Sequence, residues 1–219
     1  MKRLLSLFVA AAMLITPVAA SNEKRDKTDT YTVIAGYDFE DDGFMQKFTP
    51  QRAAAQSVPT FGGRAFDASG EIFSPPGGSF VGSFSYAFDM FFPSLADGGY
   101  ISLFDVDGSA KLVFEPISDT AAKLYATCGD NASDLGTVLI GSRRKVAVSY
   151  DSESKNISIS VGGNISTDIT AAQDIVFENI VFSFTQSFFI DDFCLSAALA
   201  ATERTPVIYR CGSLVAAQA

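Results

Sequence analysis

The sequence predicts an all-β protein that folds as a two-sheet antiparallel β-sandwich or jelly roll. About eleven short segments alternate apolar residues with polar or small ones, and Gly, Pro or Asp residues separate them. Two consecutive segments, around 145–150 and 157–161, have the pattern of a β-hairpin. No stretch of any length shows the apolar period of a helix. Many short strands with turns between them are typical of sandwiches and jelly rolls.

The N-terminus has the features of a secretory signal peptide over residues 1–20. Lys2 and Arg3 precede an apolar run from Leu4 to Val18, and the small residues Ala19 and Ala20 suit a cleavage site. The run is short for a membrane span, so we expect no stable membrane insertion after its removal. We therefore expect a secreted or extracellular protein, with the periplasm or the cell surface as alternatives.

Composition divides the remainder into a polar linker at 21–30, a sandwich domain at 31–197 and a C-terminal tail at 198–219. The tail could also lead to a further domain. Loss of the two basic residues of the signal segment leaves 14 of the 16 Lys and Arg against 25 Asp and Glu, and moves the formal charge from −9 to −11. Such an acidic chain disfavours nucleic acid as a partner. The chain contains no His, which excludes histidine-based nucleophiles and metal sites.

The first half of the domain supplies four predicted strands. Tyr31 to Glu40 reads as the first strand, ended by the acidic turn Asp41-Asp42-Gly43. Two short strands follow, at residues 62–67 and 71–73. The longest candidate, Ser83 to Pro93, has large side chains on one face and mostly small ones on the other, as in a central sandwich strand packed hard on one side. The large side chains are Phe84, Tyr86, Phe88, Met90 and Phe92.

The second half continues with short strands and the hairpin. The predicted strands are Tyr100 to Val106, Lys111 to Glu115, Lys123 to Thr127, the hairpin strands, Asp174 to Phe184 and finally Ser187 to Ala197. In the last strand, strict alternation places Phe189, Asp191, Phe193 and Leu195 on one apolar face, opposite Ile190, Asp192 and Cys194. Asp191 then needs hydrogen bonds, a cation or a metal, because an unpaired buried carboxylate is very costly.

One structural calcium ion is the cofactor that the acidic residues suggest. The first and last strands of such sandwiches are commonly neighbours, which would bring Glu40, Asp41 and Asp42 near Asp191. Calcium binds six to eight oxygens from carboxylates and carbonyls. Alternatively, Asp41 and Asp42 are turn residues and Asp191 accepts backbone hydrogen bonds.

The order of several weak motifs resembles concanavalin A-like lectin and glucanase sandwiches of the laminin-G-like kind. The motifs are Gly62-Gly-Arg-Ala-Phe-Asp67, the aromatic strand ending Phe91-Phe-Pro93, the hairpin from Arg144 to Gly163, and Phe189-Ile-Asp-Asp-Phe-Cys-Leu-Ser196. The acidic ends Phe39 to Gly43 and Phe189 to Asp192 are also similar to carbohydrate-binding modules with a galactose-binding-like jelly roll, in which such residues hold a structural calcium. Both resemblances imply a β-sandwich.

Catalysis is not expected. Adjacent residues such as Asp191 and Asp192 point to opposite faces of a regular strand, so they cannot form the carboxylate pair of a glycosidase. Laminarinase-type hydrolases share the fold that the chain resembles and carry Glu-x-Asp-x-x-Glu on one strand. The closest match, from Glu40 to Met45, ends in methionine.

The candidate ligand-binding residues are tyrosines, because an aromatic ring can stack on the face of a sugar. Tyr100 and Tyr125 lie near predicted loop boundaries, and Tyr37 is in the first strand; packing in the core or at an edge is the alternative for all three. Three cysteines permit one disulfide, for which we favour Cys194 with Cys211; three unpaired thiols are the alternative. We expect an exported, non-catalytic module that binds a glycan or a cell-surface partner, or alternatively a structural or adhesive surface protein. A polysaccharide hydrolase or lyase is least favoured.

Overall fold

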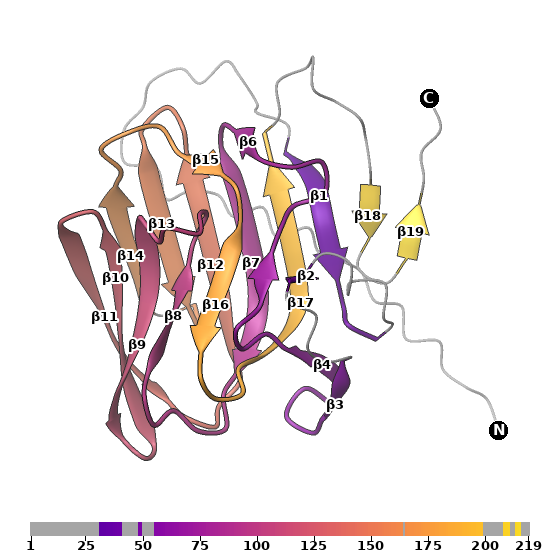
Figure 1. Cartoon of the computed structure of the whole chain (residues 1–219), viewed down its shortest axis with the longest axis vertical. Helices are drawn as coiled ribbons and strands as arrows, with labels where there is room; N and C mark the ends of the chain where they lie inside the picture. Colours follow the sequence, from indigo (N-terminus) through magenta and orange to yellow (C-terminus); the bar gives the residue numbers. More distant parts are fainter. Residues whose placement is uncertain are drawn as a thin grey trace.

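A computed structural model describes residues 31–40, 48–49, 55–163, 165–198, 208–210 and 213–215 of the chain (Figure 1). The predicted signal peptide and linker, Asp41, Asp42 and Cys211 lie outside the described residues. Strands and turns make up the described part, and it contains no helix. The described part of the chain thus has no helix with the length and apolar character needed to cross a membrane.

The strands form two antiparallel sheets, which Figure 1 shows stacked one over the other. Sheet A has the order β14-β13-β12-β7-β17-β4-β3, and β1 also pairs with β17. Its strands are β1 (Thr32–Tyr37), β3 (Gln56–Val58), β4 (Gly63–Asp67), β7 (Phe84–Phe91), β12 (Arg144–Asp151), β13 (Asn156–Val161), β14 (Ile165–Thr170) and β17 (Phe189–Ala197).

Sheet B has the order β11-β10-β9-β8-β16-β5-β2. Its strands are β2 (Phe48–Thr49), β5 (Ile72–Phe73), β8 (Gly99–Ser102), β9 (Ala110–Ser118), β10 (Ala121–Cys128), β11 (Asn131–Leu139) and β16 (Ile180–Phe184). Two small pairs, β6 (Phe80–Val81) with β15 (Val176–Phe177) and β18 (Ile208–Arg210) with β19 (Ser213–Val215), complete the described strands. The predicted two-sheet antiparallel sandwich is confirmed.

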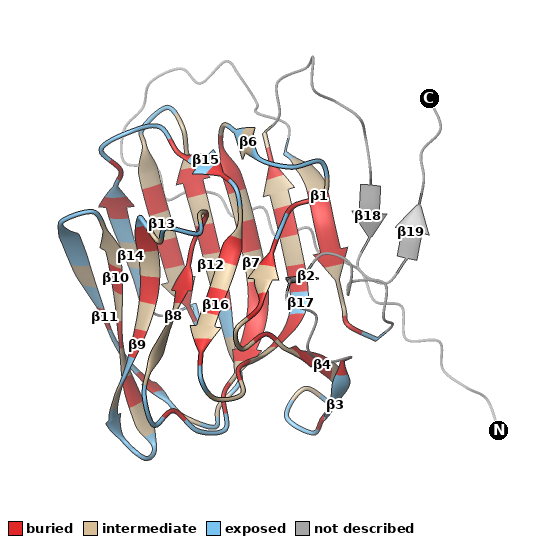
Figure 2. Cartoon of the chain, in the orientation of Figure 1, coloured by how far each residue is buried: buried red, intermediate tan, exposed pale blue. Residues whose placement is uncertain are grey.

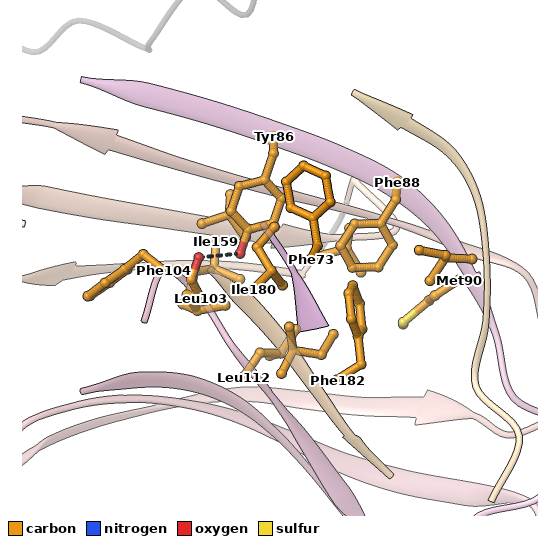
Figure 3. Close-up of a cluster of buried hydrophobic side chains, with 14 of the residues drawn as sticks. Phe73, Tyr86, Phe88, Met90, Leu103, Phe104, Leu112, Ile159, Ile180 and Phe182 are labelled. Carbon is orange, nitrogen blue, oxygen red and sulfur yellow. Dashed lines mark hydrogen bonds between the residues drawn. The ribbon is translucent and has the colours of Figure 1, made fainter. Parts of the chain in front are cut away.

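The core lies between the two sheets and is rich in phenylalanine. Buried residues recur at alternate positions along most of the strands, as the red bands of Figure 2 show. Phe88 of β7 meets Phe182 of β16 edge to face, with their ring centroids 5.7 Å apart, so the contact joins the sheets (Figure 3). Tyr86 is also buried, and its hydroxyl donates a hydrogen bond to the carbonyl oxygen of Leu103 at 3.0 Å. The polar end of a core tyrosine is thus satisfied.

β7 is the central strand that the sequence predicted. It pairs with β12 on one side and β17 on the other. Phe84, Tyr86, Phe88 and Met90 are buried, whereas the small residues of the opposite face are only half-buried. The predicted hairpin is also confirmed, since β12 and β13 pair from Val146 with Val161 to Asp151 with Asn156.

The sequence placed Phe189, Asp191, Phe193 and Leu195 on the same face of the last strand. This prediction is wrong, because a β-bulge interrupts the alternation between Asp191 and Cys194. Asp191 pairs with Asp89, but the next registered pair is Cys194 with Ala87, so β17 carries one extra residue. The extra residue allows Asp192 to adopt a φ of 50°. Phe193 and Leu195 therefore face the core together with Ile190, while Asp191 lies with Phe189 on the outer face of sheet A.

Candidate functional site

Two of the three tyrosines come together on the outer face of sheet B. Tyr100 of β8 pairs with Val113 of β9, and Val113 pairs with Tyr125 of β10, so the three form one row across adjacent strands. Their neighbours Leu112 and Leu124 are buried in the core, which turns the row toward solvent. The two tyrosine rings are half-buried and flank a branched aliphatic floor.

The tyrosine row lies in an open groove of about 520 Å³. The polar side chains that line it carry carboxylates and hydroxyls. The lining residues are Gly70, Asp97, Gly98, Gly99, Tyr100, Val113, Phe114, Glu115, Pro116, Tyr125, Ser183, Phe184 and Thr185. Aromatic rings beside a few hydrogen-bonding groups in a concave surface are the usual composition of a small-molecule site.

Glycine is required where β8 enters the groove. A Cβ atom at Gly99 would lie 2.7 Å from the carbonyl oxygen of Ser183. Gly98 has a φ of +73°, and a Cβ atom there would lie 2.7 Å from the carbonyl oxygen of Phe114. The two glycines thus allow β8 to pack closely between β9 and β16. This close packing places Tyr100 beside Ser183, its partner on β16.

One hydrogen bond joins two polar residues of the groove, and one ion pair lies beside the groove. The hydroxyl of Thr185 donates to an Asp97 carboxylate oxygen at 3.3 Å. Lys123 lies opposite Glu115 in the sheet and forms an ion pair with Asp134 at 3.0 Å. The hydrogen bond and charge of Asp134 raise the pKa of Lys123, which is therefore a cation at neutral pH.

The two tyrosines differ in how far their rings are already engaged. The ammonium nitrogen of Lys111 lies 4.7 Å from the centroid of the Tyr100 ring, in a cation–π contact. Among the described residues, no ring–ring or cation–π contact engages Tyr125. Tyr125 is therefore the more available stacking surface.

Tyr37, the third candidate, does not join the groove. Its ring stacks on Phe193 at 6.1 Å between centroids and meets Phe73 edge-on at 6.4 Å. Phe73 and Phe193 are both fully buried. Tyr37 thus packs against the core, which is the alternative that the sequence left open for it.

Glu40 and Asp191 are the two described residues of the predicted calcium site, and both contact other groups. The contacts of Glu40 are with Arg64. Glu40 accepts the backbone N–H of Arg64 through Oε1 at 3.0 Å, and its carbonyl oxygen accepts from the Arg64 guanidinium at 2.8 Å. The described residues contain no group of three or more His, Cys, Asp or Glu side chains that could hold a metal ion. A calcium site would thus depend on Asp41 and Asp42, and it stays a prediction.

Asp191 lies in a cluster of charges that the sequence did not predict. Arg143 donates to the Asp89 carboxylate from Nε at 3.0 Å and also from Nη2, and it reaches Asp192 at 3.7 Å. Burial raises the pKa of Asp191 to about 6, and the charges of Asp192 and Asp89 add to this effect. The N–H of Asp192, which donates to Asp191 at 2.9 Å, and the charge of Arg143 act in the opposite direction.

The preferred disulfide stays untested, because Cys211 lies outside the described residues. Cys194 is half-buried on β17, opposite Gly36 of β1. Cys128, at the end of β10, is also half-buried, and burial raises the pKa of its thiol, which disfavours the reactive thiolate.

No family model and no curated protein matches the chain. Among solved structures, the carbohydrate recognition domain of Emp47p matches with a TM-score of 0.47 and 10% identity, over 79% of this chain and 97% of that one. Domain 4 of AbnA, a GH43 extracellular arabinanase from Geobacillus stearothermophilus solved with arabinotriose, matches with a TM-score of 0.47 and 14% identity, over 76% and 93%.

A third similar structure is the carbohydrate-binding module CBM66 from Bacillus subtilis, with a TM-score of 0.43 and 10% identity over 69% of this chain and 96% of that one. Emp47p contributes a carbohydrate recognition domain and CBM66 is a carbohydrate-binding module. The fold assignment itself rests on the two antiparallel sheets described above.

Proposed function

We propose that the protein is an exported, non-catalytic β-sandwich module that binds a glycan in the groove on the outer face of sheet B. The observation that carries the proposal is the row of Tyr100, Val113 and Tyr125 along the groove floor. Tyrosine rings can stack on the apolar face of a sugar ring. The row would supply two such surfaces on rigid, paired strands.

The polar rim fits the hydroxyl groups of a neutral sugar. The carboxylates of Asp97 and Glu115 can accept hydrogen bonds from sugar hydroxyls, and Ser183 and Thr185 can both donate and accept. Lys123 already binds Asp134, so its charge is largely compensated. The groove therefore favours neutral hexoses or pentoses over strongly anionic glycans.

A glycan array followed by calorimetry tests the proposal. We expect the array to identify at least one neutral oligosaccharide, and Tyr125→Ala to weaken its binding about tenfold or more because a stacking surface is lost. Tyr100→Ala should have a smaller effect, since Lys111 already occupies a face of that ring. Leu139→Ala is the matched control, because Leu139 is an exposed apolar side chain of sheet B that does not line the groove.

Two results would contradict the proposal. An array without any bound glycan, combined with retained attachment of the protein to cells, would favour the structural or adhesive alternative. Cleavage of a polysaccharide by the purified protein would refute its non-catalytic part.

A structural calcium ion bound by Glu40, Asp41, Asp42 and Asp191 is a separate part of the proposal. The proposal is supported by the resemblance of two acidic segments, Phe39 to Gly43 and Phe189 to Asp192, to the corresponding segments of carbohydrate-binding modules. Asp191 is on β17, which pairs directly with β1. β1 ends at Tyr37, a few residues before Glu40 in the chain. The ion would join the first and last strands of the sandwich.

A further inference from the structure

Three phenylalanines lie on the outer face of sheet A instead of in the core. Phe91 of β7 pairs with Phe189 of β17, and their near-parallel rings are 6.3 Å apart. Phe61, from the turn between β3 and β4, meets Phe91 edge to face at 6.2 Å. All three are half-buried. Connected aromatic rings on a solvent-facing surface suggest a ligand or partner.

A row of acidic residues runs beside these rings. Asp89 and Asp191 pair across β7 and β17 and lie two residues from Phe91 and Phe189 on the same strands. The two rows therefore share one face and lie about 7 Å apart along the strands. This separation is about the size of one sugar ring. We call the two rows together the Phe–Asp face.

Asp191 retains the capacity to bind a ligand. The residue is only 8% exposed, and its Oδ1 accepts just the N–H of its neighbour Asp192. In the described part of the chain, no hydrogen bond or ion pair reaches Oδ2. This oxygen is not among the buried unsatisfied atoms of the described residues, so it reaches the surface beside the aromatic row and can accept a hydrogen bond from a ligand hydroxyl.

The other charges of this face have defined roles. Arg143 binds Asp89 and lies 4.9 Å from the centroid of the Phe61 ring. Its guanidinium thus connects the acidic row to the aromatic rings. Lys145 is exposed opposite Asp89 on β12. With Asp192, and with Asp67 opposite Phe189 on β4, the face has four carboxylates against two cations, and this excess of negative charge disfavours an anionic ligand.

The two rows beyond the acidic row carry small side chains that are half-buried. Ala87 pairs with Cys194, and Ser85 pairs with Ser196, in the next two rows of the same face. These small side chains form a low floor that continues from the Phe–Asp face.

We propose that the Phe–Asp face is a second binding site for a neutral sugar ring, which stacks on Phe91 and Phe189 and donates a hydroxyl hydrogen bond to Asp191. This site is on the opposite sheet from the tyrosine groove and shares no residue with it. Asp191 is also part of the proposed calcium site, so calcium and the sugar would compete for this carboxylate. A chain with both sites is bivalent. It can crosslink two glycan chains or hold one polysaccharide more firmly through avidity.

An NMR titration of the full chain distinguishes the two sites. The ¹⁵N-labelled protein is titrated with cellobiose, lactose, mannobiose, xylobiose and arabinobiose in turn. We expect at least one sugar to shift the amides of Phe91 and Asp191 saturably. Tyr125→Ala should leave those shifts unchanged, because Tyr125 is on the other sheet. If sugars shift the amides of Phe91 and Asp191 but never the amide of Val113, the result supports the second site and contradicts glycan binding in the tyrosine groove.

Two substitutions test which side chains bind the sugar. Phe91→Ala removes the stacking surface, and Asp191→Asn keeps the shape of the acceptor but removes its charge. Each should weaken binding at this face about fivefold or more. Asp191→Asn serves as the decisive variant if Phe91→Ala does not fold. The proposal is wrong if none of the five sugars shifts these amides saturably, or if the shifts keep full affinity in Asp191→Asn and in every folded Phe91 variant.

Discussion

At the scale of single residues, the burial of Asp191 makes the stability of the folded protein depend on pH. Its pKa of about 6 is above the value of about 4 that an aspartate has in an unfolded chain. The folded protein therefore binds a proton more tightly than the unfolded chain does. The contribution of this group to stability is fully present below pH 4 and is lost as the pH rises through 6.

We predict that, in calcium-free buffer, Asp191→Asn stabilises the protein at high pH but not at low pH. The amide is neutral at every pH, like the protonated acid, and its oxygen can still accept the N–H of Asp192. The gain in free energy of unfolding should be close to zero at pH 4 and about 1–2 kcal/mol at pH 8, after an allowance for solvent screening. Urea unfolding at both pH values measures it.

Asp130→Asn is the control for this measurement, because Asp130 is exposed in a turn. It should change stability equally little at both pH values. A loss of stability in Asp191→Asn at pH 8 would show that the charged carboxylate stabilises the fold, contrary to the expected sign.

At the scale of elements, the bulge in β17 determines which side chains reach the core. Asp192 has a φ of 50°, a conformation that Asp and Asn tolerate and β-branched residues do not. We predict that Asp192→Val lowers the free energy of unfolding by about 1–2 kcal/mol relative to Asp192→Asn. Both substitutions remove the carboxylate near Arg143, so their difference isolates the backbone conformation. Equal urea midpoints for the two variants would argue against the bulge.

The sequence predicted the strands that are packed on one face. β7 and the β12–β13 hairpin have strict alternation because one side of each faces the core. Among the described strands of six or more residues, two were missed, β11 and β14, which are the last strands of their sheets on the same side of the sandwich. β11 is largely exposed and contains Gly136, so its pattern is weak.

The candidate sites were predicted in part, for a related reason. Tyr100 and Tyr125 were identified by residue type, but only the register through Val113 shows that they lie in one row. The bulge in β17 moved Asp191 to the other face, since one inserted residue reverses the alternation. Arg143 begins the basic stretch Arg143-Arg144-Lys145, but its pairing with Asp89 depends on how a loop meets β7, which no local pattern encodes.

At the scale of the whole molecule, the proposed calcium ion would join the two ends of the sandwich. We predict that a chelator lowers the melting temperature of the protein and that Asp41→Asn removes the difference between chelated and calcium-loaded samples. Differential scanning calorimetry measures both. Identical melting curves with and without chelator would remove calcium from the account.

The sandwich also explains how one small domain can present two separate surfaces. Each sheet uses one face for the shared core and leaves the other to solvent, so the tyrosine groove and the Phe–Asp face are on opposite sides of the core. The tyrosine row and the three outer phenylalanines are not among the fully buried side chains that hold the sheets together. Changes to ligand specificity on one face should therefore leave the other face and the core intact.

A crystal structure of the full chain with the neutral oligosaccharide identified on the array tests the central claim most directly. The account predicts a sugar ring stacked on Tyr125, with hydroxyls hydrogen-bonded to Asp97 or Glu115. A bound oligosaccharide that makes no contact with Tyr100, Val113 or Tyr125 would contradict it.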